Sequence, residues 1–415
     1  MNAEHLRVTI IALNYSPEQT GIAPYTTDLA NGLTQRGHTV RVITGYPHYP
    51  SWTIDQKYKG NRLLEEIGRV PVQRVRQYTP KSLNNLKRVA LEFSFGIRAI
   101  LENWHQPNII VCTSPALLAT MLITARAKLT RNGPAIGIWV QDIYSRGLAE
   151  TSSTPKLATK LATKLESRIL RSADGIVVIH DRFKIALNNG LSVDLMKITS
   201  IRNWTHIKLL KVNSIKKVRE RLNWDENETV ILHAGNMGVK QGLENVIQAA
   251  KISHNKKLPL RFVLLGDGNQ RTKLQETCGD LPNLDFLDPM DDEDFQATLK
   301  AADILLVNEL PGVIDMAVPS KLTTYFAMAK PILAATDSGS ATSDEIKLSN
   351  AGRRVDAGKP VALLDLALEM SRNSEEREEL GRNGLSFYQN VLTRESAIDK
   401  FERWALSTTR KGESS

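Results

Sequence analysis

The length of 415 residues exceeds one ordinary domain and suits two, and the composition, 41% hydrophobic and 24% charged, is that of a soluble globular protein. The two cysteines, one in each half of the chain, exclude a disulfide framework and a cysteine-based metal site, which favours a reducing cytoplasm. No apolar run reaches the roughly 18–20 residues of a spanning helix, and the first one, residues 6–13, is too short for a signal peptide.

The net charge of +9 is unevenly distributed along the chain. Residues 1–204 carry 26 lysines and arginines against 14 acidic residues, a net charge of +12. Residues 205–415 carry 28 against 31, a net charge of −3. A basic first half indicates an anionic partner, and anionic lipid, a pyrophosphate-linked acceptor and nucleic acid are the alternatives.

The first half alternates strand and helix patterns. Residues 7–15 form a nearly continuous apolar run, typical of a strand buried on both faces, and a helix is predicted to begin near Pro24 and end at Gly37. Further strands are predicted at residues 39–44, 108–113, 135–140, 175–179 and 197–201, with helices between them. This βαβ rhythm predicts a doubly wound parallel sheet.

The second half repeats the same rhythm more regularly. Strands are predicted at residues 229–234, 260–265, 283–287, 303–307 and 331–335. Helices are predicted at residues 243–254, 271–277, 291–301, 321–329 and 360–372. Five strand–helix units in about 150 residues predict a second Rossmann-like domain, so the fold class is α/β with two Rossmann-like doubly wound domains.

The boundary between the domains is predicted near residues 203–213, which gives a first domain of residues 1–204 and a second of residues 205–390. Residues 375–407 predict two consecutive helices with no strand after them. We expect the last helix, about residues 391–410, to pack back on the first domain.

Ligands of open α/β sheets bind beyond the carboxyl ends of the strands, so the loops at those ends are the candidate sites. The loop at residues 14–24 carries Gly21 before a helix start, whose free N–H groups suit a diphosphate. The loop at residues 235–242 carries Lys240, which could hold a phosphate together with the backbone dipole, although it is not a Walker motif. An ordinary turn glycine and a surface lysine are the alternative interpretations.

Two further loops have the same position. Gly266 follows a strand, although such a glycine is more often a tight turn than a ligand site. The segment at residues 312–325 places Pro319 in the first turn of a helix, followed by Ser320 and Lys321, where an anion is favoured. An ordinary capped helix is the alternative.

Seven segments in this order resemble one known family. They are Leu13–Glu18 with Gly21–Ala23, Arg36–Val40, Tyr46–Trp52, Trp139–Asp142, Asn203–Trp204, Gly235–Gly242 and Val318–Lys321. Over nearly the whole chain, the sequence resembles the GT4-type retaining glycosyltransferases of the GT-B fold. It is most similar to the WcaI-like branch of colanic acid and exopolysaccharide glycosyltransferases.

The resemblance implies two Rossmann-like domains that face a cleft, with the acceptor held by the first and the sugar nucleotide by the second. It implies a GDP- or UDP-sugar as donor substrate, no cofactor and no metal. The implied acceptor is a saccharide or a polyprenyl-diphosphate-linked saccharide.

The resemblance also implies functional residues. It assigns catalytic roles to Lys240 and Lys321. The other residues are implied for the donor diphosphate and sugar (Gly21, Gly235, Asn236, Ser320, Leu322), the nucleoside (Gly266, Met290, Thr324) and the acceptor side (Gln141, Asp142).

Several positions depart from the family pattern. Many members carry an arginine where this chain has Asn236, so one phosphate-binding charge is missing. The usual pair of glutamates, eight residues apart, falls on Met316 and Thr324. The usual acceptor-side histidine is Gln141. The WcaI-like branch tends to share these departures.

The stretch from Lys57 to Arg98 contains ten lysines and arginines among apolar residues, which predicts an amphipathic, membrane-surface segment beside the acceptor site. A solvated basic loop followed by a core helix is the alternative, and nucleic acid is disfavoured because no binding motif accompanies the charge. We therefore expect a cytoplasmic protein, peripheral at the inner face of the cell membrane.

Two rival functions remain open. One is a GT-B sugar-nucleotide epimerase, which needs no acceptor. The other is a non-catalytic, degenerate homologue that acts as the partner of another transferase, and Met316 and Thr324 support it.

Overall fold

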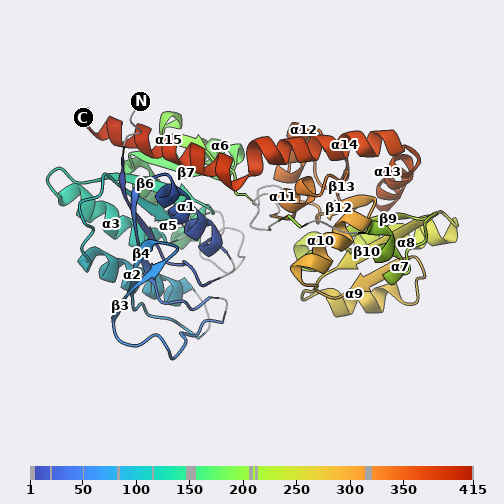
Figure 1. Cartoon of the computed structure of the whole chain (residues 1–415), viewed down its shortest axis with the longest axis horizontal. Coiled ribbons are helices and arrows are strands. Elements are labelled where there is room, and N and C mark those ends of the chain that lie inside the picture. The colour runs from blue at the N-terminus through green and yellow to red at the C-terminus, as the bar shows by residue number, and fades with distance from the viewer. Residues whose placement is uncertain are drawn as a thin grey trace. The chain divides into compact units, whose positions relative to one another are not determined.

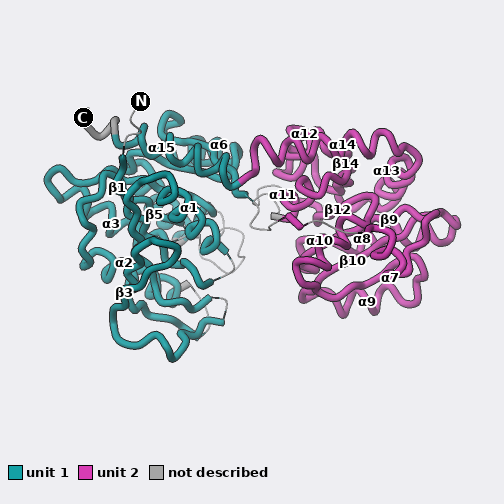
Figure 2. The backbone as a smooth tube through the Cα atoms, in the orientation of Figure 1, with its two compact units in different colours: residues 1–206, 394–415 teal, residues 207–393 magenta. Residues whose placement is uncertain are grey.

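The computed structural model describes residues 5–413 except 19–20, 50, 82–84, 115, 146–155, 205–208, 211–213 and 314–319. The chain divides into two compact units, residues 1–206 with 394–415 and residues 207–393 (Figure 1, Figure 2). Each unit contains one sheet built mainly from parallel strands, so the predicted α/β class with two Rossmann-like domains is confirmed.

Unit 1 contains an eight-stranded sheet in the order β3-β4-β2-β1-β5-β6-β7-β8. Its strands are β1 (Arg7–Ala12), β2 (Thr39–Gly45), β3 (Arg62–Ile67), β4 (Val70–Val75), β5 (Ile109–Thr113), β6 (Ala135–Val140), β7 (Gly175–Val178) and β8 (Ile198–Ser200). Its helices are α1 (Ala23–Gln35), α2 (Asn85–Leu101), α3 (Leu117–Leu129), α5 (Lys156–Ser172), α6 (Asp181–Leu191) and α15 (Arg394–Glu413). One face of the sheet is covered by α2, α3, α5 and α6, and the other by α1 and α15.

The last helix, α15, completes the core of unit 1 (Figure 1). Trp404 lies against glycines of two neighbouring strands, so that a Cβ atom at Gly137 would come within 2.3 Å of its ring. Phe401 packs edge-on against Trp139, with ring centroids 4.7 Å apart. The charged side of α15 is tied to the loop after α1, where the His38 Nε2 atom lies 2.9 Å from Glu402 Oε1.

Two strands of unit 1, the edge strand β3 and its neighbour β4, were not predicted from the sequence. The antiparallel pair β3 and β4 is joined by the two-residue turn Gly68-Arg69, in which both residues have positive φ. Part of the basic stretch between Lys57 and Arg98 is therefore sheet, and Val70 and Val72 are core residues rather than surface ones.

Unit 2 contains a six-stranded sheet in the order β11-β10-β9-β12-β13-β14. Its strands are β9 (Thr229–Ala234), β10 (Leu260–Leu265), β11 (Leu284–Leu287), β12 (Ile304–Asn308), β13 (Ile332–Ala335) and β14 (Gly352–Val355). Its helices are α7 (Ile215–Arg221), α8 (Glu244–Asn255), α9 (Arg271–Cys278), α10 (Asp292–Ala301), α11 (Ser320–Ala327), α12 (Ala341–Ser349), α13 (Pro360–Arg372) and α14 (Ser374–Phe387). Helices α8, α9 and α13 pack on one face of the sheet and α7, α10, α11 and α12 on the other, and α14 contributes to both cores. The sequence did not predict α7, α12 or β14.

In the part of the chain that the structure describes, no helix is both long and apolar enough to cross a membrane.

Candidate active site

The sheet of unit 2 has one point at which the strand order reverses. From β9 the chain proceeds through β10 to β11 on one side, and through β12 to β14 on the other. Ligands of open α/β sheets bind at the carboxyl ends of the strands at such a point. Gly235, which follows β9, and Glu309, which follows β12, both lie there.

The loops after β9 and β10 contact each other backbone to backbone. Gly235 donates its N–H to the carbonyl oxygen of Leu265 at 2.9 Å. A Cβ atom at Gly266 would lie 2.2 Å from the carbonyl oxygen of Gly235, and one at Gly268 would lie 2.5 Å from that of Met237. Close packing of the two loops therefore accounts for these glycines, including the predicted nucleoside residue Gly266.

Lys240 lies in a short 3₁₀ turn, Val239–Gln241, that ends at Gly242 in the left-handed conformation, φ +54°. The turn is fixed to the end of β12: the Asn308 side-chain amide donates to the carbonyl oxygens of Gln241 at 2.7 Å and of Gly242 at 2.9 Å. The Lys240 side chain is exposed and makes no hydrogen bond or ion pair with the residues that the structure describes. The backbone is thus held in place while the ammonium group is available to a ligand.

Lys321, in the first turn of α11, lies at the same strand ends. Its Nζ atom is 3.1 Å from Nε2 of His233, a fully buried residue of β9, and 3.7 Å from a Cβ atom placed on Gly235. A Cβ atom at position 235 would thus make an ordinary van der Waals contact with the lysine, and the φ of +121° is what favours glycine there. The three residues bring a basic group, its neutral partner and an open backbone position together.

Burial lowers the pKa of Lys321 to about 7, and the negative charge of Glu309 opposes that shift. Burial and the nearby Lys321 together hold the pKa of His233 well below its usual range. The imidazole is therefore neutral at physiological pH and can accept a hydrogen bond from the lysine.

Glu309 and His233 were not predicted from the sequence. The carboxylate of Glu309 accepts hydrogen bonds from the hydroxyls of Thr336 and of Thr342, the latter at 2.5 Å. Glu309 follows the apolar strand β12, and His233 lies within the apolar strand β9. In such strands a polar side chain is the only sign of a site that the sequence contains. A polar residue in an otherwise apolar buried run is unusual, and this signal points to both residues.

The other predicted donor residues take varied positions in unit 2. Leu322 is fully buried in the core, so only its backbone is available to a ligand. Thr324 is buried, Met290 is half-buried beside the hydroxyl of Thr298, and Asn236 is exposed. The side chain of Ser320 and the whole of Met316 lie outside the described residues.

The predicted acceptor residues lie in unit 1, one strand away from the point between β1 and β5 at which the strand order reverses. Gln141 follows β6, and its side-chain amide pairs reciprocally with that of Asn203, at 3.1 and 2.8 Å. This pairing connects the segments Trp139–Asp142 and Asn203–Trp204. The side-chain amide of Gln141 is therefore hydrogen-bonded to the protein itself. Gly21, with φ +65°, lies after β1 in the left-handed region that favours glycine.

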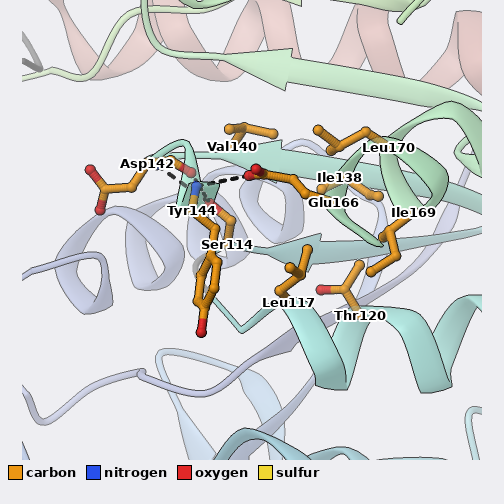
Figure 3. A pocket seen from close by; sticks show the side chains of 10 residues that line it. All are labelled: Ser114, Leu117, Thr120, Ile138, Val140, Asp142, Tyr144, Glu166, Ile169 and Leu170. Carbon is orange, nitrogen blue, oxygen red and sulfur yellow. Dashed lines mark hydrogen bonds between the residues drawn. The ribbon is translucent and has the colours of Figure 1, made fainter. Parts of the chain in front are cut away.

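A small hollow lies beside Asp142, bounded by β6, α3 and α5 (Figure 3). Glu166 fixes its rim by accepting hydrogen bonds from the backbone N–H groups of Tyr144 at 2.8 Å and Ser145 at 3.0 Å. The carboxylate of Asp142 points away from the apolar lining in Figure 3. This side chain is therefore placed to meet a ligand outside the hollow.

Comparison with known proteins places the whole chain in one family. Residues 20–204 match the glycosyl transferase 4-like domain, and residues 214–387 match the glycosyl transferases group 1. The chain is 31% identical over 338 residues to WcaI of Escherichia coli K12, provisionally assigned as a colanic acid biosynthesis glycosyl transferase. This similarity covers 78% of the chain and 81% of WcaI. The chain belongs to the GT4-type, GT-B glycosyltransferases.

Solved structures agree on the fold of this glycosyltransferase. Sucrose-phosphate synthase from Thermosynechococcus elongatus has a TM-score of 0.71 at 15% identity, covering 98% of this chain and 100% of that one. Anabaena HepE, in complex with UDP, has a TM-score of 0.70 at 12% identity, covering 97% of this chain and 100% of HepE. The predicted GT-B fold is thereby confirmed.

Proposed function

We propose that this glycosyltransferase transfers a sugar, with retention of anomeric configuration, from a GDP- or UDP-sugar to a saccharide or polyprenyl-diphosphate-linked saccharide in cell-surface polysaccharide synthesis. The observation that carries the donor part is the cluster of Lys321, His233 and Gly235 at the strand-order reversal of unit 2. The similarity to WcaI supports the polysaccharide part, and the UDP complex of HepE supports a nucleotide donor.

The chemistry needs stabilisation of negative charge on the leaving diphosphate more than it needs a protein base, because that diphosphate can accept the proton of the acceptor hydroxyl. Lys240 supplies an exposed ammonium group on a fixed turn. Lys321 supplies a second amino group, a buried one, beside Gly235, and its protonated form places a cation next to the loop in which Asn236 replaces the arginine of many family members. We therefore propose that Lys321 substitutes for that arginine and that no metal is required.

The pKa of Lys321 gives the proposal a pH signature. The diphosphate of a sugar nucleotide does not titrate near neutrality, so a pH-dependent affinity must come from the protein. We expect the donor Kd to rise as pH increases through about 7, because the free enzyme then loses the Lys321 proton. At pH 8 donor binding should take up a proton, which calorimetry in buffers of different ionisation enthalpy measures. Uptake that persists in Lys321→Met would contradict the assignment.

The function is tested by measuring the thermal stabilisation of the protein by a panel of sugar nucleotides, and then transfer from the best one to polyprenyl-diphosphate saccharides in the presence of EDTA. Transfer with retained configuration supports the proposal. Release of an altered nucleotide sugar without acceptor identifies an epimerase. Stabilisation without transfer to any acceptor identifies a non-catalytic homologue, and loss of transfer in EDTA refutes metal independence.

We also propose that the enzyme binds the surface of the membrane through one helical layer of unit 1. Helix α2 buries Leu91 and Phe95 but exposes a second apolar face, with Leu86 81% and Phe93 48% accessible. Helix α5 exposes Leu157 and Leu161 on one face, where Lys160 and Lys164 also lie. Both helices contact α3. Apolar side chains beside cations suit the surface of an anionic membrane.

We expect the double substitution Leu86→Ser and Phe93→Ser to reduce sedimentation with vesicles of phosphatidylglycerol and phosphatidylethanolamine at least severalfold, because it removes two exposed apolar contacts. Leu348→Ser, which changes an exposed leucine of unit 2 that is 58% accessible, is the control. Equal binding by the wild type and the double variant would refute this docking face.

A further inference from the structure

The loop after β2 carries the family-like segment that the proposed function leaves without a role. It contains Tyr46, His48 and Tyr49, then Ser51 and Trp52, and we call these residues the aromatic loop. Because β1 and β2 are parallel neighbours, paired at Ala12 and Thr44, the loop emerges beside the loop that carries Gly21.

The first part of the aromatic loop is held by buried polar groups. The carboxylate of Glu18 is buried, and its Oε1 accepts the backbone N–H of His48 at 2.8 Å and of Tyr49 at 2.9 Å. Its Oε2 accepts from the Asn14 amide at 2.8 Å. Hydrogen bonds to a buried carboxylate are among the strong ones, so the backbone of the loop is fixed before any ligand arrives.

Gln77 fixes the base of the same loop. Its side-chain oxygen accepts the N–H of Tyr46 at 2.8 Å, and its amide donates to the Tyr46 carbonyl oxygen at 2.9 Å. The Tyr46 ring is fully buried, and its hydroxyl donates to the carbonyl oxygen of Lys59 at 3.0 Å. Side chains from three neighbouring strand ends thus hold one short segment.

The tip of the loop presents aromatic rings to solvent. The Tyr49 side chain is 40% accessible and the Trp52 side chain is half-buried. Their ring centroids are 5.8 Å apart and their planes are nearly perpendicular, at 86°. The His48 ring packs edge-on against the Trp52 ring, with ring centroids 5.6 Å apart. The two rings form a corner of two fixed apolar surfaces.

The corner lies next to the glycine assigned to the donor diphosphate. The Cε1 atom of Tyr49 is 3.9 Å from a Cβ atom placed on Gly21. Trp52 has φ +54°, which a bulky residue rarely adopts and which the fold must stabilise. Residues held in such conformations are concentrated at ligand-binding sites.

We propose that Tyr49 and Trp52 form a ring-stacking subsite for the pyranose of the acceptor, which rests on the proposed transferase function. A pyranose has an apolar C–H face and a hydroxylated rim, and aromatic corners beside polar groups match both. Polar side chains lie close to the two rings in the sequence, namely Ser51, Thr53 and Asp55, the last paired with Lys57. The exposed face of α2, by contrast, is apolar and flanked by cations.

The test substitutes each ring separately. Trp52→Gly removes the indole and suits the positive φ, and Tyr49→Leu keeps an apolar side chain over Gly21 without an aromatic face. Tyr78→Leu, which removes another exposed tyrosine ring of unit 1, is the control. We expect the KM for the acceptor to rise roughly tenfold in each loop variant, with the KM for the donor and the Tm unchanged.

An unchanged acceptor KM in an active enzyme would overturn the subsite while leaving the transferase function intact. Loss of vesicle binding without a change in the acceptor KM would also overturn the subsite. Saturation-transfer NMR with methyl glycosides of glucose, galactose, mannose, fucose and N-acetylglucosamine tests the subsite without turnover. Wild-type signals that Trp52→Gly abolishes support the subsite even if no donor is bound and the transferase function fails. Absence of saccharide signals in the wild type overturns it.

Discussion

Lys240→Ala is expected to reduce kcat/KM for transfer by roughly 100- to 1000-fold, the usual loss when one charged or hydrogen-bonding group that stabilises developing negative charge is removed. The side chain of Lys240 is exposed and has no partner among the described residues, so its loss removes no contact of the fold. The Tm should therefore change by no more than a degree or two, as for an ordinary surface substitution.

Lys256→Ala provides the matched control, because it removes another exposed lysine of unit 2. Steady-state transfer rates and thermal unfolding of both variants test the predicted role of Lys240. Wild-type turnover in Lys240→Ala would end the assignment of this lysine to the donor diphosphate. A large fall in Tm would show that its role is structural.

Lys321→Met should change activity and stability in opposite directions. A partly buried ammonium group whose pKa has fallen to about 7 is costly to keep charged, and methionine of similar length fills the same space without that cost. We expect the variant to be at least as stable as the wild type. We also expect transfer to fall by roughly 100-fold or more, because the cation beside Gly235 is lost.

The stability difference should depend on pH with a defined sign. In the unfolded chain Lys321 keeps its proton up to about pH 10.5, whereas in the folded protein it loses the proton near pH 7. Between these values the unfolded state binds more protons, so the wild type gains stability as pH rises. The advantage of Lys321→Met in denaturant unfolding should therefore shrink from pH 7 to pH 10. A constant advantage would contradict the lowered pKa.

The sequence predicted the strands of unit 2 well because parallel strands buried on both faces are continuous apolar runs. The predicted strands at residues 229–234 and 260–265 match β9 and β10 to the residue. It failed for β14, whose sequence is Gly-Arg-Arg-Val and whose side chains are half-buried. It failed for β3 and β4 because a charged antiparallel pair, with buried and partly exposed residues alternating along it, was interpreted as an amphipathic surface segment.

The candidate site was predicted where glycines and lysines mark strand ends. Gly235, Lys240 and Lys321 were predicted in this way, and their roles stay predictions. The partners that set the chemistry were not, because the contact of His233 with Lys321 joins residues 88 positions apart and the shift in the lysine pKa depends on burial. The pattern of residues along the sequence shows neither this long-range contact nor the burial of the lysine.

The position of α15 has a consequence for how the protein is made. The ribosome releases residues 1–206 first, yet the surface of β6 and β7 that includes Gly137 is covered only by Trp404 and its neighbours, which emerge last. Until then Trp139 lacks the ring of Phe401 against which it packs. Part of the apolar sheet of unit 1 therefore stays uncovered until synthesis of unit 2 is complete. A chain terminated at residue 393 would contain all of unit 2 and would still lack the helix that completes the core of unit 1.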